Sequence, residues 1–324
     1  MMSGVGGAIG ILADAAFWAA VIAIAAPLLI AALGAVICGQ TGMLALGIEG
    51  TFAAGALAAL LAAHSGKAHW AALIVAAATG ALIGLISGTL TSPLHLPQRA
   101  TGFAITLLAA GLSQFIFGIM FATNSAAPAT VAMGSIDVSW ITRLPYVSTL
   151  SDLPYLGAFG RALVHATPPV YAALLLALVV SYVINTTPLG LALRACGENP
   201  AAIAAQGRSV HDLRVGASTI GAALMAIGGG TVALTSAGAF SFSLVSGRGF
   251  AALMLAIIAG WRVGRTFLAV VAFAMIDTYQ LHLQNRLGEP PALALSQLLP
   301  YAIAFIVLVA TSPSTMRRFP LSAD

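Results

Sequence analysis

The stretch PLGLALRACGENPAAIAAQGRSVHDLR, residues 188–214, is a polar segment in an otherwise apolar chain. The whole chain has only 13 basic and 9 acidic residues, and five of these 22 fall here: Arg194, Glu198, Arg208, Asp212 and Arg214. Gly-Glu-Asn-Pro at 197–200 is typical of a helix start, AAIAAQ favours a helix, and Gly207 ends it. A helix of under two turns is marginal in water by itself. We therefore expect it to dock on another protein, the alternative being a loop that merely carries the basic residues typical of cytoplasmic connections.

The composition on either side of this segment is that of an integral membrane protein. Of 324 residues, 60% are hydrophobic and 7% are charged, with a mean hydropathy of +1.01, whereas soluble domains carry about 25% charged residues. A membrane helix needs about 20 apolar residues. We predict an all-α, polytopic protein of about 8–10 transmembrane helices, with residues 1–324 forming a single domain. The net charge is +4, and the basic residues are scattered singly between apolar runs. This pattern indicates membrane topology and not nucleic-acid binding.

Nine apolar runs define the expected helices. They lie at about 15–37, 42–63, 70–91, 102–121, 169–186, 213–235, 249–262, 265–284 and 293–312. The third carries Gly80, Gly84 and Gly88 on one face, a stripe that predicts close approach of a neighbouring helix. The seventh is short and follows a Gly- and Ser-rich stretch, which predicts a broken or re-entrant helix.

Basic residues in the connections predict the orientation. The polar segment at about 188–212, the turn with Arg262 and Arg265, and the C-terminal tail should be cytoplasmic, and the loop at about 122–168 should be external. The N-terminus then lies outside and, lacking a basic region before its first apolar run, does not resemble a cleavable signal. The outer loop is apolar enough to lie on the membrane surface, where it could meet a delivering protein.

Three ionisable residues fall in or beside apolar runs, namely Glu49, Arg248 and Asp277. A charge at the bilayer centre costs about 2.5–3.5 kcal/mol on insertion scales, so each needs water or a partner. We expect them to line a polar path. The alternatives are snorkelling of Arg248 to the headgroups and structural ion pairing of the two carboxylates. GIEGTFAA and GRGFAA each place a charge between glycines, and this similarity predicts an inverted repeat whose halves meet at the site.

Motifs for catalysis and metal binding are missing from the sequence. No Gly-x-x-x-x-Gly-Lys-Ser/Thr occurs, so ATP would have to be hydrolysed on another subunit. There is no His-Glu-x-x-His or Gly-x-Ser-x-Gly, and both cysteines are isolated. We predict no catalytic residue, no metal and no cofactor.

Several segments in order resemble one family. They are GQTGMLALGIEGTFAAGALAA, LPYVSTLSDLPYLG, TTPLGLALRACGENPAAIAAQG, FSFSLVSGRGFAALMLAIIAGW and DTYQLHLQ. These are similar to ABC-importer permeases of the branched-chain amino acid, sugar and nucleoside superfamily, nearest the shorter nucleoside-type subunit. Ala45 stands where that group usually has Asn, and Thr106 likewise.

The resemblance implies half of a translocation path for a nucleoside or purine derivative in a bacterial inner membrane. The basic tail predicts a cytoplasmic C-terminus. It implies three partners: a cytoplasmic ABC ATPase, a second, homologous permease subunit in a heterodimer, and an extracytoplasmic substrate-binding protein. Coupling to the ATPase would use Glu198, Asn199, Pro200, Ala202, Ala205, Gln206 and Gly207. Aromatic and hydroxyl surface along the path is expected from Thr106, Phe240, Phe242 and Phe250. The alternative functions are a secondary transporter using Glu49 and Asp277 for ion or proton coupling and, more remotely, an intramembrane enzyme.

Overall fold

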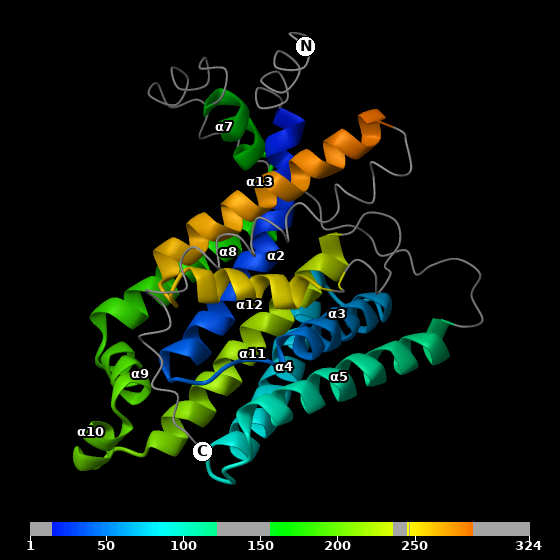
Figure 1. Ribbon diagram of the computed structural model, residues 1–324. Coiled ribbons are helices and arrows are strands. Elements are labelled where there is room, and N and C mark those ends of the chain that lie inside the picture. The colour runs from blue at the N-terminus through cyan, green and yellow to red at the C-terminus, as the bar shows by residue number, and fades with distance from the viewer. Residues whose placement is uncertain (1–14, 122–155, 236–244, 246, 288–324) are drawn as a thin grey trace.

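The computed structural model describes residues 15–121, 156–235, 245 and 247–287, and this part of the chain is helical apart from short connections (Figure 1). The helices are α2 (Ala15–Gln40), α3 (Ile48–His64), α4 (His69–Thr91), α5 (Gln98–Phe121), α7 (Leu156–Val164), α8 (Pro168–Thr186), α9 (Pro188–Glu198), α10 (Pro200–Ala205), α11 (Val210–Thr235), α12 (Arg248–Ile258) and α13 (Val263–Leu287). Five of them, α2, α4, α5, α8 and α11, are long and apolar enough to cross a membrane, and α3 and α12 are shorter apolar helices. The prediction of an all-α membrane protein is confirmed.

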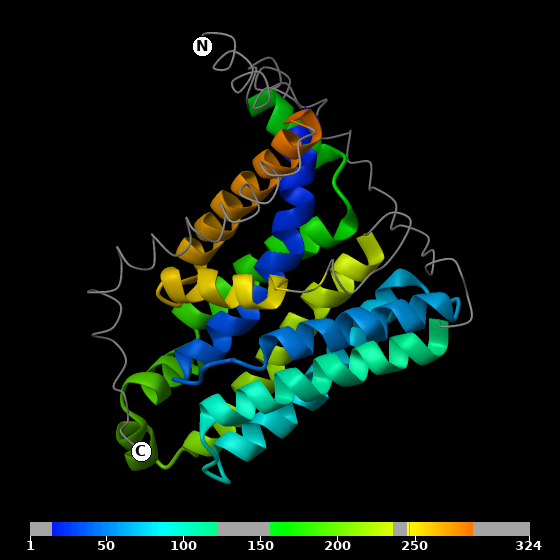
Figure 2. The same cartoon turned by 45° about the vertical axis from the view of Figure 1, so that its right-hand side comes forward.

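Two helices form the centre of the bundle. The most apolar windows of α2 and α11 are 83% and 78% buried, against 11–28% for α4, α5 and α8. The outer helices therefore keep apolar faces on the surface, as helices in contact with lipid or with other apolar helices do. In Figure 2 the other helices lie around this central pair.

The same set of helix contacts occurs twice. α11 packs against α3 and α4, and α2 packs against α12 and α13. α3 also touches α4, α12 touches α13, and the two short helices α3 and α12 touch each other. Exchanging α2, α3 and α4 with α11, α12 and α13 leaves this pattern unchanged, which is the arrangement expected of an internal repeat.

The predicted glycine stripe lies against α11. A methyl group on Gly80 would overlap the Ala222 carbonyl oxygen, and one on Gly84 would overlap that of Ser218. The Ser218 hydroxyl donates to the Gly84 carbonyl at 2.9 Å. α4 and α11 therefore pack backbone to backbone, as small residues on membrane helices allow.

One end of the bundle, which we call the basic end, gathers most of the described arginines. The hydroxyl of Ser92, which follows α4, lies 3.0 Å from Nδ1 of His211 in α11, and Gln40 Nε2 donates to the Trp261 carbonyl at 2.6 Å. Lys67, in the turn between α3 and α4, lies at the opposite end. The basic end holds Arg99, Arg194, Arg208, Arg214, Arg262 and Arg265. These connections share one side, as predicted.

Some boundaries differ from the expected ones. The run predicted from residue 42 becomes helical only at Ile48, and residues 43–45 are not helical. The chain turns at Gly42, whose left-handed φ of 77° does not occur in an α-helix. Residues 188–198 form the helix α9, which was not predicted, and Thr187 caps it by accepting from the Gly190 N–H at 3.2 Å. Most of the outer loop, the run at 293–312 and the C-terminal tail lie outside the described residues.

Candidate functional site

The N-termini of the two short helices α3 and α12 meet at Glu49. Glu49 lies in the first turn of α3, and its carboxylate accepts from the Gly247 N–H at 2.5 Å and from the Phe250 N–H at 3.0 Å. Both donors belong to the start of α12. The two Gly-flanked segments predicted to approach each other therefore do so.

Arg248 and Asp277 form the second charged element at this place. Arg248 is the first residue of α12 and is half-buried. An electrostatic attraction links it to Asp277, a half-buried residue of α13. The three predicted charges thus lie on three different helices. Of these, α12 contacts both α3 and α13.

Of the other residues predicted along the path, Thr106 and Phe250 are described. The Thr106 hydroxyl donates to the Leu46 carbonyl at 2.9 Å, and Thr106 is buried. Thr106 holds α5 against the start of α3, since a methyl group on Gly50 would lie 2.7 Å from the Thr106 Cα. Phe250 is half-buried against the main core. Phe240 and Phe242 lie outside the described residues.

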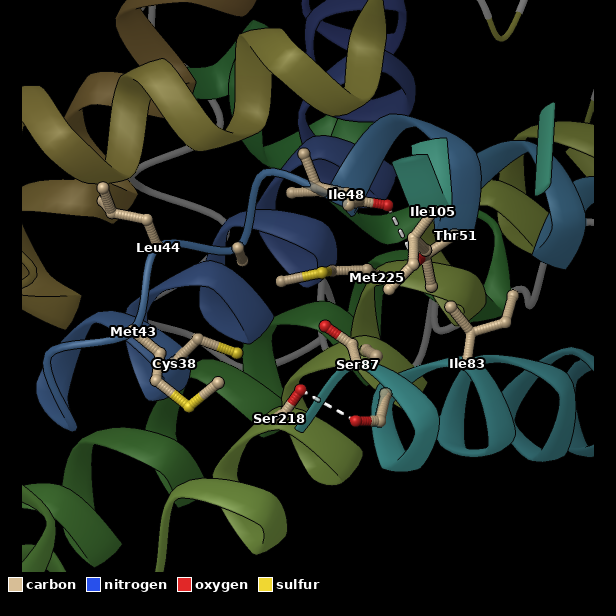
Figure 3. A pocket seen from close by; sticks show the side chains of 14 residues that line it. Cys38, Met43, Leu44, Ile48, Thr51, Ile83, Ser87, Ile105, Ser218 and Met225 are labelled. Atoms are coloured by element: carbon tan, nitrogen blue, oxygen red, sulfur yellow. Dashed lines mark hydrogen bonds between the residues drawn. The ribbon is translucent and has the colours of Figure 1, made fainter. Parts of the chain in front are cut away.

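We call the contact between the starts of α3 and α12 the junction. A small cavity of about 30 Å³ lies beside it (Figure 3). Gly47, Ile48 and Thr51 of the α3 start border it, together with Cys38, Ser87 and Ser218 of the neighbouring helices. It has room for water, which needs about 10–15 Å³, but not for a solute, whose pockets take about 300–1,000 Å³. This cavity by itself is therefore too small to hold such a solute.

The polar segment at the basic end contains the short helix that the sequence predicts. α10 spans Pro200–Ala205, Asn199 caps it by accepting from the Ala202 N–H at 3.2 Å, and Gly207 follows with a left-handed φ of 74°. Ile203 is only 2% exposed and packs with Ala192 and Cys196 of α9. One apolar side chain thus anchors α10 to the bundle.

The rest of α10 faces outward. The residues predicted to couple with an ATPase are exposed, apart from the half-buried Pro200; the exposed ones are Glu198, Asn199, Ala202, Ala205, Gln206 and Gly207. Small side chains on an exposed helix leave its backbone open to close approach by another surface. This geometry suits docking into a groove.

Sequence reasoning missed two features of these sites. The first is Gly249, where a methyl group would lie 2.7 Å from Glu49 Oε2 and 2.8 Å from its Cα. The sequence marked this glycine as part of the Gly-flanked repeat but did not indicate its close approach to Glu49. The second is Arg214, whose charge acts on the thiol of Cys196, and no local pattern indicated that contact. Within the described residues, no three His, Cys, Asp and Glu side chains are grouped as they would be around a metal ion.

Comparison with known proteins finds relatives that are all named as ABC transporter permeases. The chain is 31% identical over 198 residues to the guanosine ABC transporter permease protein NupQ of Bacillus subtilis, covering 59% of this chain and 58% of that protein. It is 25% identical to the nucleoside ABC transporter permease protein NupC of Lactococcus lactis, covering 58% and 57%. It is 30% identical to a glucose ABC transporter permease protein, TsgC13 of Haloferax volcanii, covering 53% and 49%. The chain thus spans about half the length of these relatives.

A solved structure and a family model extend the similarity over most of the chain. A metal-chelate type ABC transporter in an inward-facing conformation matches 91% of this chain and 85% of its own, with a TM-score of 0.50 and 13% identity, which shows a shared fold. Residues 17–308 match the family described as the permease component of branched-chain amino acid transport systems. That match includes both Glu49 and α10, and the chain belongs to this permease family.

Proposed function

We propose that this chain is a membrane-embedded subunit of an ABC importer and forms half of the path for a small polar solute, a nucleoside or purine derivative. The observation that carries the proposal is α10, a capped helix whose exposed face projects from the basic end while Ile203 anchors it. An isolated helix of this length needs a surface to stabilise it. A cytoplasmic ABC ATPase with a groove for α10 would supply that surface.

The remaining partners follow from the same assignment. A second, homologous permease subunit would complete the path in a heterodimer, since the cavity at the junction is much smaller than a solute. An extracytoplasmic substrate-binding protein would deliver the solute. The basic end would face the cytoplasm of a bacterial cell, and the C-terminus would lie on the same side. ATP would be hydrolysed on the ATPase and not on this chain.

The nucleoside assignment is supported by the relatives NupQ and NupC, whose names state guanosine and nucleoside transport. The family description names branched-chain amino acids and TsgC13 names glucose, so three solute classes compete. A nucleobase is planar and stacks on aromatic rings, and Phe250 at the start of α12 offers one. Membership in the permease family does not favour the secondary-transporter alternative.

Uptake into proteoliposomes tests both the mechanism and the solute class. The chain is reconstituted with the ABC ATPase, the second permease and the binding protein that the proposal requires, and uptake of labelled guanosine, glucose and leucine is compared with ATP inside the vesicles. We expect ATP-dependent uptake of guanosine, reduced by Asp277→Asn without loss of assembly. Uptake of leucine or glucose alone would refute the solute class, and uptake driven by an ion gradient without ATP would refute the importer.

A further inference from the structure

The helix α12 begins at a residue that cannot cap it. Its N-cap is Gly247, with φ 84°, and glycine has no side chain to accept from the free N–H groups of the first turn. In an apolar bundle such groups must find acceptors inside the protein. α12 therefore depends on another part of the chain for its first turn.

Glu49 is that part. Its two carboxylate oxygens accept from the Gly247 and Phe250 N–H groups separately, from a position 198 and 201 residues away in sequence. Glu49 also lies in the first turn of α3. The positive ends of two helix dipoles thus point at one carboxylate, and backbone N–H groups compensate its charge.

The contact continues from the side chain to the backbone. At Gly249 a methyl group would lie 2.7 Å from Glu49 Oε2, 2.8 Å from Glu49 Cα and 3.1 Å from Glu49 N. The start of α12 therefore rests directly on the start of α3. Only glycine at position 249 permits this approach.

The bonded amides of Gly247 and Phe250 bracket Arg248. Fixing the backbone on both sides of Arg248 fixes the direction in which its side chain leaves α12, and its charge attracts Asp277 of α13. We propose that Glu49 is a positioning residue: by capping α12 it orients Arg248 toward Asp277, and it neither binds the solute nor carries a coupling ion. This inference rests on the proposed function in so far as Arg248 and Asp277 line the path.

Hydrogen exchange tests the cap without any transport assay. The purified chain in nanodiscs is compared with Glu49→Ala, Glu49→Gln and Gly249→Ala, following amide exchange in peptides that cover residues 245–252. We expect exchange at Gly247 and Phe250 to rise about tenfold or more in Glu49→Ala, since hydrogen bonds to charged groups are the stronger ones. Glu49→Gln keeps one acceptor oxygen, so its exchange rate should lie between those of the unaltered chain and Glu49→Ala.

A matched control is Gly264→Ala. Gly264 is the second residue of α13, as Gly249 is of α12, but a methyl group there would meet nothing within 4 Å. It should leave exchange in 245–252 unchanged, whereas Gly249→Ala should raise it. Unchanged exchange in Glu49→Ala would overturn the proposal even if ATP-driven uptake is confirmed, and raised exchange would support the cap even if uptake fails.

Transport then separates positioning from ion coupling. If Glu49 acts through Arg248, each single change removes the same contact, that of Arg248 with Asp277. The double variant Glu49→Ala with Arg248→Met should then transport no more slowly than the slower single variant. Glu49→Gln should lower maximal uptake and keep the shape of its pH profile. Losses that multiply, or a profile that becomes flat in Glu49→Gln, would show an independent or ion-carrying role and refute the proposal.

Discussion

Gly34 of α2 and Gly221 of α11 are in backbone contact where the two central helices cross. A methyl group on Gly34 would overlap the Gly221 carbonyl oxygen, and one on Gly221 would lie 2.7 Å from the Gly34 carbonyl oxygen. Neither oxygen belongs to a flexible side chain that could move aside. The spacing of the two halves of the bundle is therefore set at this crossing.

Gly34→Ala should consequently destabilise the bundle. Overpacking a close-packed interior costs about 1–3 kcal/mol, so we expect a lower unfolding temperature in detergent. Gly118→Ala is the control, because a methyl group at Gly118 of α5 would meet nothing within 4 Å. Equal unfolding temperatures for Gly34→Ala and Gly118→Ala would contradict the contact.

Charge on the outer face of α10 should uncouple transport from ATP hydrolysis. Ala202 and Ala205 are exposed while Ile203 anchors the helix, so the double change to Arg should leave insertion intact. A loss of only about 1.4 kcal/mol of docking free energy weakens binding tenfold. We expect uptake to fall by a similar factor while basal ATPase activity persists.

Ala68→Arg is the control for that experiment, because Ala68 is also exposed but lies in the turn at the opposite end. Its uptake should match that of the unaltered chain. If uptake stays normal with Arg at both 202 and 205, α10 is not the docking helix.

Cysteine labelling in intact cells tests the orientation. Ser209 at the basic end and Ser65 at the opposite end are both exposed, and the native Cys38 and Cys196 are buried. A membrane-impermeant maleimide should label Ser65→Cys in intact cells, and Ser209→Cys only after permeabilisation. The reverse pattern would invert the predicted topology.

The thiol of Cys196 should be unreactive and should make stability depend on pH. Burial raises the pKa of this thiol above its ordinary value, and the nearby Arg214 guanidinium offsets part of that effect. With a raised native pKa, the folded state holds its proton where the unfolded state loses it. The stabilisation is thus complete below the unfolded pKa and is lost as pH rises through the native one.

We expect the unfolding free energy to decline in mildly alkaline solution and Cys196→Ser to reduce that decline. At pH 8, Ser209→Cys should react with maleimide well before Cys196. Fast labelling of Cys196 in the folded protein would show that its burial is incomplete.

The sequence by itself determined the class of fold and the position of the short helix α10. Apolar runs of spanning length and basic connections are local properties, and the cap Asn199, Pro200 and the stop at Gly207 act within a few residues of each other. These features do not depend on what the distant chain does. α9 was missed, because its apolar and basic residues alone do not distinguish a helix from a loop.

Only the tertiary structure decided what Glu49 contacts. The sequence marked it as a charge that needs a partner, and an ion pair with Arg248 would have met that need. Its partners are instead backbone N–H groups at the start of α12, which carry no sequence signal of their own. They are available because Gly247 cannot cap its own helix and Gly249 lets two backbones meet, and both conditions are met only when α3 and α12 have packed.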